Sequence, residues 1–246
     1  EGWIVGLVYL ALVVVGLLVD IGLIAYCLVH PPRTREHVER LKARPWSWYE
    51  AGVLVFLLAT MFLCLFAVQG LLCRVPGFPG PESSAWLVVQ SVTFHWTGLL
   101  FVAHLVSRRK LSWHGAMGGD RRSFAKDLLL GALFYLGAIP VLWFYSLFYQ
   151  MGLKYFGYNP TWQEVALVLT DEQNPWMRFY LMFMAIGLAP LFEEFLFRGI
   201  GLPLLARRWG VARAVIVVSA FFAAIHFHVP SLVPLFVIAA AFSLAY

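Results

Sequence analysis

Two adjacent carboxylates and an arginine stand out in the stretch LFEEFLFRG, because the residues before them are almost all apolar. A charged side chain at the centre of a bilayer costs at least about 2.5–3.5 kcal/mol, so such residues usually pair or serve a function. On a helix, Glu194 and Arg198 share a face and can form an ion pair. Glu193 points about 100° away and has no partner on its own helix. Pro190 removes a backbone donor just before the pair, which is expected to loosen or kink the helix.

The histidine His226, in the stretch FFAAIHFH, is expected to reach the same membrane depth as Glu193. Their two apolar segments are joined near RRWG, and both residues lie 16.5 residues from position 209.5. Antiparallel helices rise equally per residue, so the two side chains can hold a water between them, which is a general-base arrangement for hydrolysis. The same pair can form half of a metal site or part of a proton relay. Each residue can also serve packing alone, as a hydrogen-bonding partner of a neighbouring span.

The composition is that of a membrane protein. The 246 residues are 61% hydrophobic and 13% charged, whereas soluble domains carry about 25% charged residues. We predict an all-α fold, a polytopic helical membrane protein with a single membrane domain over residues 1–246. Because the chain begins at Glu1 and ends within an apolar segment at Tyr246, we expect it to be a fragment. About seven transmembrane helices are expected, with ends uncertain by about 2–4 residues, at Gly2–Val29, Trp48–Leu72, Ala85–Val106, Asp127–Tyr149, Trp176–Ile200, Val211–His228 and Leu232–Tyr246.

Lysines and arginines gather in alternate loops. The loops 30–47, 107–126 and 207–213 are rich in them, whereas the loops between carry only one or two. The positive-inside rule places the rich loops in the cytoplasm and the N-terminus outside, in an integral protein of the cell (plasma) membrane. The net charge of +5 then serves to orient the protein and to attract anionic headgroups. Membrane lipid is therefore an expected partner, and nucleic acid is not.

Tryptophan and cysteine positions add two smaller expectations. Several tryptophans near the segment ends are expected to form an aromatic belt at the membrane surface, namely Trp46, Trp48, Trp86, Trp113 and Trp176. The three cysteines show neither metal-type nor disulfide spacing, and Cys27 and Cys64 are expected to be small buried hydrophobic residues.

The charged residues and the histidine together match a known pattern. EEFLFR, with Glu193, Glu194 and Arg198, followed by FAAIH, with Phe222 and His226, resembles the EExxxR and FxxxH motifs of the CPBP family. This family contains intramembrane proteases of the CAAX-prenyl-endopeptidase and bacteriocin-processing type. The resemblance covers roughly residues 176–246, and the family's third motif, a His followed four residues later by Asn or Asp, would lie beyond Tyr246. Two motifs at this spacing in a membrane hairpin form a fairly specific signal.

The resemblance implies an intramembrane endopeptidase that hydrolyses a peptide bond of a membrane-associated or CAAX-like peptide or protein substrate. Glu193 would activate the attacking water, and His226 with the third-motif residues would position that water and stabilise the oxyanion. Arg198 would hold Glu194, and Phe222 would support the histidine. A glutamate mechanism with no metal or other cofactor is expected, with a zinc ion as the alternative.

Two other classes of function compete with the protease. One is a non-catalytic membrane scaffold or bacteriocin-immunity-type protein of the same fold, which would keep the motif for packing. The other is a transporter or proton-coupled carrier. Transporters usually show internal repeats and broken helices in corresponding halves, and the sequence shows neither.

Overall fold

The computed structural model describes residues 2–30, 34–78, 80, 83–117, 124–159, 161 and 163–246. All regular structure in these residues is helical, which confirms the all-α prediction. The chain forms two compact units. The first contains Glu1–Arg44, Gly118–Thr161 and Leu202–Tyr246, and the second contains Pro45–Met117 and Trp162–Gly201. A single membrane domain over residues 1–246 stays a prediction.

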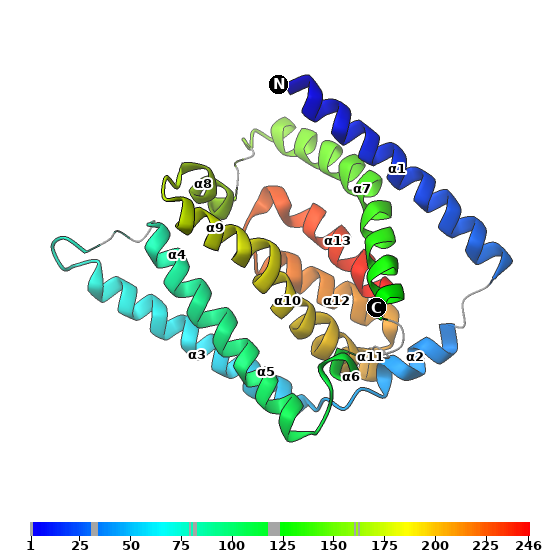
Figure 1. Cartoon of the computed structure of the whole chain (residues 1–246), viewed down its shortest axis with the longest axis horizontal. Helices are drawn as coiled ribbons and strands as arrows, with labels where there is room; N and C mark the ends of the chain where they lie inside the picture. The colour runs from blue at the N-terminus through cyan, green and yellow to red at the C-terminus, as the bar shows by residue number, and fades with distance from the viewer. Residues whose placement is uncertain are drawn as a thin grey trace. The chain divides into compact units, whose positions relative to one another are not determined.

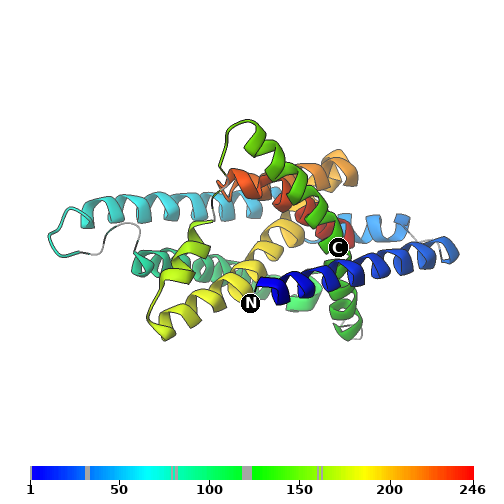
Figure 2. The ribbon, with the colours of Figure 1, turned by 90° about the horizontal axis from the view of Figure 1, so that it is seen from above.

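The first unit is built from apolar helices packed side by side. α1 (Gly2–Val29) runs beside α7 (Phe124–Tyr155), and α13 (Leu232–Ala245) packs on α7 and on α12 (Val211–Ala224) (Figure 1). α11 (Leu202–Trp209) contacts α12 and α2 (Thr34–Lys42), and the short 3-10 helix η4 (Val229–Ser231) precedes α13. Figure 2 shows α1 as one unbroken helix. α7 is bent in Figure 1, as expected for a helix with Pro140 in its interior, because proline lacks the backbone donor.

The second unit combines a helical hairpin with the segment that carries the two glutamates. In the hairpin, α3 (Trp48–Leu72) packs against a continuous run of α4 (Ser84–Ser91), η1 (Val92–Trp96) and α5 (Thr97–Arg108). α6 (Trp113–Met117) follows it. The second segment runs through α8 (Glu164–Asp171), α9 (Pro175–Phe183), η2 (Met184–Leu188), α10 (Ala189–Glu194) and η3 (Phe195–Gly201). The elements η1, η2 and η3 are π-helical.

One polar cluster ties together the two ends of the hairpin. Ser47 caps α3 in a capping box, in which Glu50 N donates to Ser47 Oγ at 3.3 Å and Ser47 N donates to Glu50 Oε2 at 2.9 Å. Arg109, just after α5, donates from Nε and Nη2 to the two oxygens of Glu50, at 2.8 and 2.9 Å. A bidentate pair of this kind fixes both distance and orientation. The start of α3 is therefore held at the end of α5.

The lengths of the helices confirm a polytopic integral membrane protein. Among the described residues, five helices are long and apolar enough to cross a membrane, namely Gly6–Val29, Trp48–Leu72, Ala85–Arg108, Leu128–Tyr155 and Pro175–Trp209. They correspond to the first five predicted segments. The other two segments form shorter apolar helices, Val211–Ala224 and Val229–Ala245, below the roughly 20 residues that a span needs. Seven transmembrane helices therefore stay a prediction.

Side-chain exposure corrects two expectations from the sequence. Trp46 and Trp86 are only 1% and 5% exposed, so they are core residues and not part of an aromatic belt. Cys27 and Cys64 are exposed, so the prediction that they are buried is wrong. Both errors have the same cause. In a membrane protein the outward face of a helix is as apolar as its core, so hydrophobicity alone cannot tell which residues face lipid and which face protein.

Candidate active site

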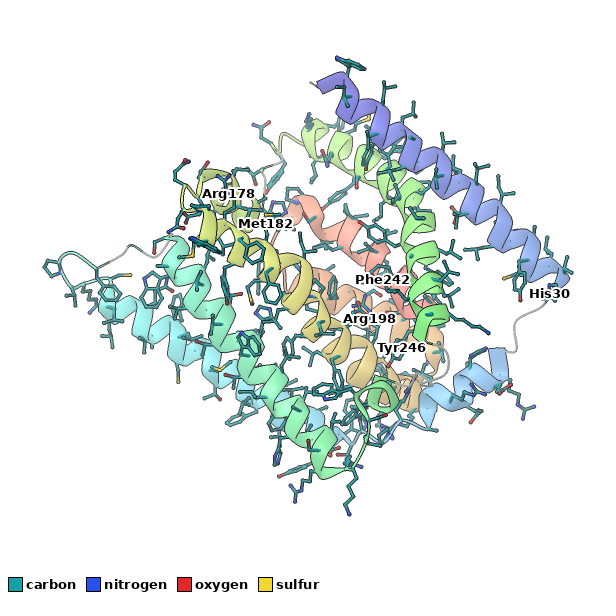
Figure 3. All side chains as sticks on the ribbon, viewed as in Figure 1. His30, Arg178, Met182, Arg198, Phe242 and Tyr246 are labelled. Carbon is teal, nitrogen blue, oxygen red and sulfur yellow. The ribbon has the colours of Figure 1, made fainter. Side chains whose placement is uncertain are left out.

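An ion pair joins the second glutamate to the arginine of the motif. Arg198 Nη1 lies 3.0 Å from Glu194 Oε1, and the arginine side chain is only 1% exposed while that of Glu194 is 36% exposed. Arg198 is labelled on its helix in Figure 3. A buried guanidinium needs a compensating charge, because losing its hydration is costly. The spacing of four residues thus produces the pair that the sequence predicts.

The first glutamate is in a different situation. Within the part of the chain that the structure describes, Glu193 makes no hydrogen bond and no ion pair, although it is partly buried. The guanidinium of Arg198 does interact electrostatically with both glutamates. Glu193 therefore lies within the field of a cation without being held by it, and its carboxylate oxygens are available to another group.

Aromatic packing sets the direction in which the two carboxylates point. Phe192 and Phe195, which bracket the glutamates, are 1% and 2% exposed. The ring of Phe195 meets those of Trp46 and Trp113 edge to face, with centroids 5.9 and 5.7 Å apart. At about 100° per residue, positions 192 and 195 lie on one face of the helix, and positions 193 and 194 lie on the other. Burial of the two phenylalanines thus turns both carboxylates away from the aromatic cluster.

The ring of Phe192 packs closely against the helical hairpin at Gly98. A Cβ atom at Gly98 would overlap with the Phe192 ring, so only glycine allows this close approach. The same ring packs edge to face on Phe94 and His95, with centroid distances of 5.9 and 5.8 Å. His95 Nδ1 lies 2.9 Å from the Ser91 carbonyl oxygen, to which it donates, so its Nε2 is the acceptor nitrogen.

A backbone carbonyl one turn earlier in the chain fixes the tautomer of His226, the histidine of the second motif. His226 Nδ1 lies 2.8 Å from the Phe222 carbonyl oxygen, and the two rings are 4.8 Å apart. Since a carbonyl can only accept, Nδ1 carries the proton, and Nε2 is left as the acceptor. The four-residue spacing of FxxxH therefore fixes the tautomer as well as the ring position. In the described residues, His226 Nε2 has no hydrogen-bonding partner.

The neighbouring histidine is bonded at both nitrogens. His228 Nδ1 lies 2.8 Å from Ser231 Oγ, and its Nε2 lies 3.1 Å from the Thr161 carbonyl oxygen. With Nε2 donating to the carbonyl, Nδ1 accepts from the hydroxyl. His228 thus joins the start of η4 to the segment before α8 through both ring nitrogens, whereas His226 is bonded only through Nδ1 to the residues that the structure describes.

The two motifs belong to different units of the chain. Glu193, Glu194 and Arg198 lie in the second unit, and Phe222 and His226 lie in the first. The turn predicted near RRWG is confirmed, with α11 ending at Trp209 and α12 beginning at Val211. The premise of uniform α-helices is wrong, because residues 195–201 are π-helical and α12 ends at Ala224, two residues before the histidine. Equal membrane depth of Glu193 and His226 stays a prediction.

π-Helical segments flank the two glutamates, whereas the sequence predicted only a loosened or kinked helix at Pro190. In the described residues all the π-helical segments lie in the second unit, and two of them, η2 and η3, directly flank α10. Pro190 has no N–H for the carbonyl of Ile186, so the α-helical bonding pattern cannot continue there, and the loosening expected at Pro190 takes the form of a π-turn. Such turns occur frequently at functional sites.

No three His, Cys, Asp or Glu side chains come together in a way that could hold a metal ion, as far as the described residues are concerned.

Comparison with known proteins identifies one segment. Residues 175–246 match the family described as Rce1-like, Type II CAAX prenyl endopeptidase Rce1-like. The match begins at the first residue of α9 and includes both motifs. No curated protein and no solved structure matches the chain. The resemblance to the CPBP family is thus confirmed for this segment, and it suggests an intramembrane protease.

Proposed function

We propose, from the Rce1-like CAAX prenyl endopeptidase (CPBP) domain at residues 175–246, that the protein is an intramembrane endopeptidase. Its substrate is a membrane-associated or CAAX-like peptide or protein. The observation that carries this proposal is the unequal state of the two adjacent glutamates in the matched segment. Glu194 is paired with Arg198, while Glu193 is partly buried and, among the described residues, has no bonded partner. An ionisable side chain within an apolar span supports a functional-site hypothesis by default.

In this mechanism Glu193 is the general base. It takes a proton from a water molecule, and the water oxygen attacks the carbonyl carbon of the scissile peptide bond. The carbonyl π-electrons move onto oxygen and give a tetrahedral oxyanion. When the intermediate collapses, the C–N bond breaks, and the proton held by Glu193 passes to the leaving nitrogen. The products are a new carboxylate and a new amine.

His226 would act on the same water and on the oxyanion. Its Nε2 is an acceptor in the tautomer set by the Phe222 carbonyl, so it can accept a hydrogen bond from the attacking water. If the imidazole instead enters the reaction protonated from solvent, the same nitrogen donates a hydrogen bond to the oxyanion. Glu194 and Arg198 would act indirectly, by holding the helix turn that presents Glu193, and Phe222 would act by holding the histidine.

The scaffold alternative rests on the same packing. The ion pair and the aromatic cluster around Phe195 stabilise the helix whether or not any chemistry follows. A scaffold or bacteriocin-immunity-type protein, however, does not require an acceptor at His226 Nε2 or a Glu193 carboxylate that has no bonded partner among the described residues. Replacing these two side chains therefore separates the two functions.

A cleavage assay with a histidine variant tests the proposal. The parent protein in lipid vesicles is expected to cleave a prenylated CAAX-like peptide, with products identified by mass spectrometry. His226→Ala should lower the rate about 10²-fold or more, the contribution typical of a positioned acid–base group. His104→Ala is the matched control, because His104 is exposed on α5 in the other unit. Equal rates for the two variants, or no cleavage by the parent, would contradict the protease proposal.

The orientation proposed with this function places the N-terminus outside the cell membrane, with seven transmembrane helices in one membrane domain. Arg33, Arg121 and Arg122, which belong to the predicted cytoplasmic loops, lie outside the described residues. Arg108 is described, and it is exposed at the end of a candidate span. The alternation of cationic loops is what supports this orientation.

Cysteine labelling of intact cells tests that orientation. In a background with the three native cysteines replaced by serine, Val75→Cys should react with a membrane-impermeant maleimide, and Arg108→Cys should react only after permeabilisation. Both positions are exposed. Arg108 is preferred to Arg109 because Arg109 is bonded to Glu50. Labelling of Arg108→Cys in intact cells would show that the proposed topology is wrong and that its orientation is the reverse.

A further inference from the structure

An open groove lies at the turn between α11 and α12. It has a volume of about 350 Å³ and is lined by Trp209, Arg213, Ile216 and Val217, all in the first unit. Gly210, at φ 81°, makes the turn, in a backbone conformation that favours glycine. Arg213, Ile216 and Val217 follow helical spacing, so they share one face of α12. Trp209 is 45% exposed, and Ile216 and Val217 are 57% and 40% exposed.

The lining surface of the groove is mostly apolar, and the residue types beside it change along the helix axis in the order found in a phospholipid. The candidate span Pro175–Trp209 ends at Trp209, a residue type that favours the headgroup level of a membrane. Arg213 lies in the first turn of α12. Ile216 and Val217 lie about 4.5–6 Å further along, at 1.5 Å per residue. The cationic Arg213 is thus followed along the helix by the aliphatic side chains of Ile216 and Val217. The phosphate of a phospholipid is followed by its acyl chains in the same order.

The charge of this region is cationic. Arg208 and Arg213 fall within six residues, and the sequence contains no Asp or Glu after Glu194. Arg208 and Arg213 are exposed, and neither makes an ion pair with any residue that the structure describes. Basic pockets at the cytoplasmic side of membrane helices attract anionic headgroups. An anionic group is therefore the complement of this groove.

We propose that the groove binds one phospholipid with an anionic headgroup. The Arg213 guanidinium, with Arg208 beside the turn, contacts the phosphate, and the Trp209 indole N–H supplies a further donor at the same level. The first part of an acyl chain lies against Ile216 and Val217. This site is separate from Glu193 and His226, and its occupancy requires no peptide substrate. The lipid proposal can therefore be tested independently of the protease proposal.

Native mass spectrometry of the detergent-solubilised protein tests this site. Phosphatidylglycerol and phosphatidylcholine with identical acyl chains are titrated into the parent and four variants. The parent should bind one phosphatidylglycerol in preference to phosphatidylcholine. Arg213→Gln should weaken phosphatidylglycerol binding about fivefold, as expected for one cation near a lipid surface, and Arg213→Lys should keep most of it. Val217→Trp fills the groove without changing charge, and should weaken the binding of both lipids.

Arg108→Gln is the matched control, because it removes an exposed arginine at the end of another candidate span. It should leave the lipid preference unchanged. If Arg108→Gln and Arg213→Gln weaken binding equally, the effect is general surface charge and the proposed site is wrong. If glycerol phosphate or inorganic phosphate displaces the lipid fully while Val217→Trp has no effect, the groove is an anion site, and the lipid assignment is overturned.

Discussion

Glu193→Gln is expected to abolish peptide hydrolysis while leaving the protein folded and inserted in the membrane. Glutamine keeps the size of glutamate but cannot take a proton from water, so the loss should be at least about 10²-fold. The fold should tolerate the change, because Glu193 makes no ion pair or hydrogen bond with any described residue. The change also removes a desolvated charge from an apolar span. The thermal unfolding midpoint in detergent should therefore equal or exceed that of the parent.

The measurement compares cleavage rate and unfolding midpoint in the same preparations. Glu194→Gln serves as the matched control, since it makes the same chemical change one residue away, on the glutamate that is paired. It should lower stability more than Glu193→Gln and activity less. Near-parental cleavage by Glu193→Gln would show that Glu193 is not the base, and the scaffold interpretation would then be preferred.

Arg198→Ala should lose stability and activity together. The arginine is 1% exposed, and its removal leaves the Glu194 carboxylate without its partner. Breaking a buried pair from one side costs about 3–5 kcal/mol. The cost here should fall near the lower end, because Glu194 is 36% exposed and keeps some hydration. Activity should fall because the helix turn that presents Glu193 loses its anchor.

The double variant Arg198→Ala/Glu194→Gln separates charge from packing. It removes the unpaired carboxylate, so it should recover part of the lost unfolding free energy, although the space left by the guanidinium remains. Unfolding of all four proteins, including Glu194→Gln alone, completes a double-mutant cycle. A double variant no more stable than Arg198→Ala would show that the pair contributes nothing through its charges.

The features that follow from local spacing were predictable from the sequence. The first five long apolar helices follow from segment length. The Glu194–Arg198 pair is expected from the four-residue spacing on an α-helix, and it forms although Arg198 lies in the π-helical segment η3. The hairpin turn at Gly210 follows from a basic loop between two apolar runs. None of these requires knowledge of how the helices pack.

The features that depend on packing were missed. Trp46 was expected at the membrane surface, but it is buried against Phe195. The contact of His95 with Phe192, beside the motif, is seen only in the structure. Gly98, three residues after His95, was the available signal, because a small residue on the same helix face marks a close approach. The end of α12 before His226 was missed, because the apolar run continues past it.

The most direct test of the account follows the oxygen of the attacking water. A prenylated CAAX-like peptide is cleaved in water enriched in oxygen-18, and the new carboxylate is analysed by mass spectrometry at matched times for the parent and Glu193→Gln. The product of the parent should carry one labelled oxygen, because water supplies the nucleophile, and the variant should form no product above background. Labelled product formed by Glu193→Gln at the parental rate would contradict the assignment of Glu193 as the base.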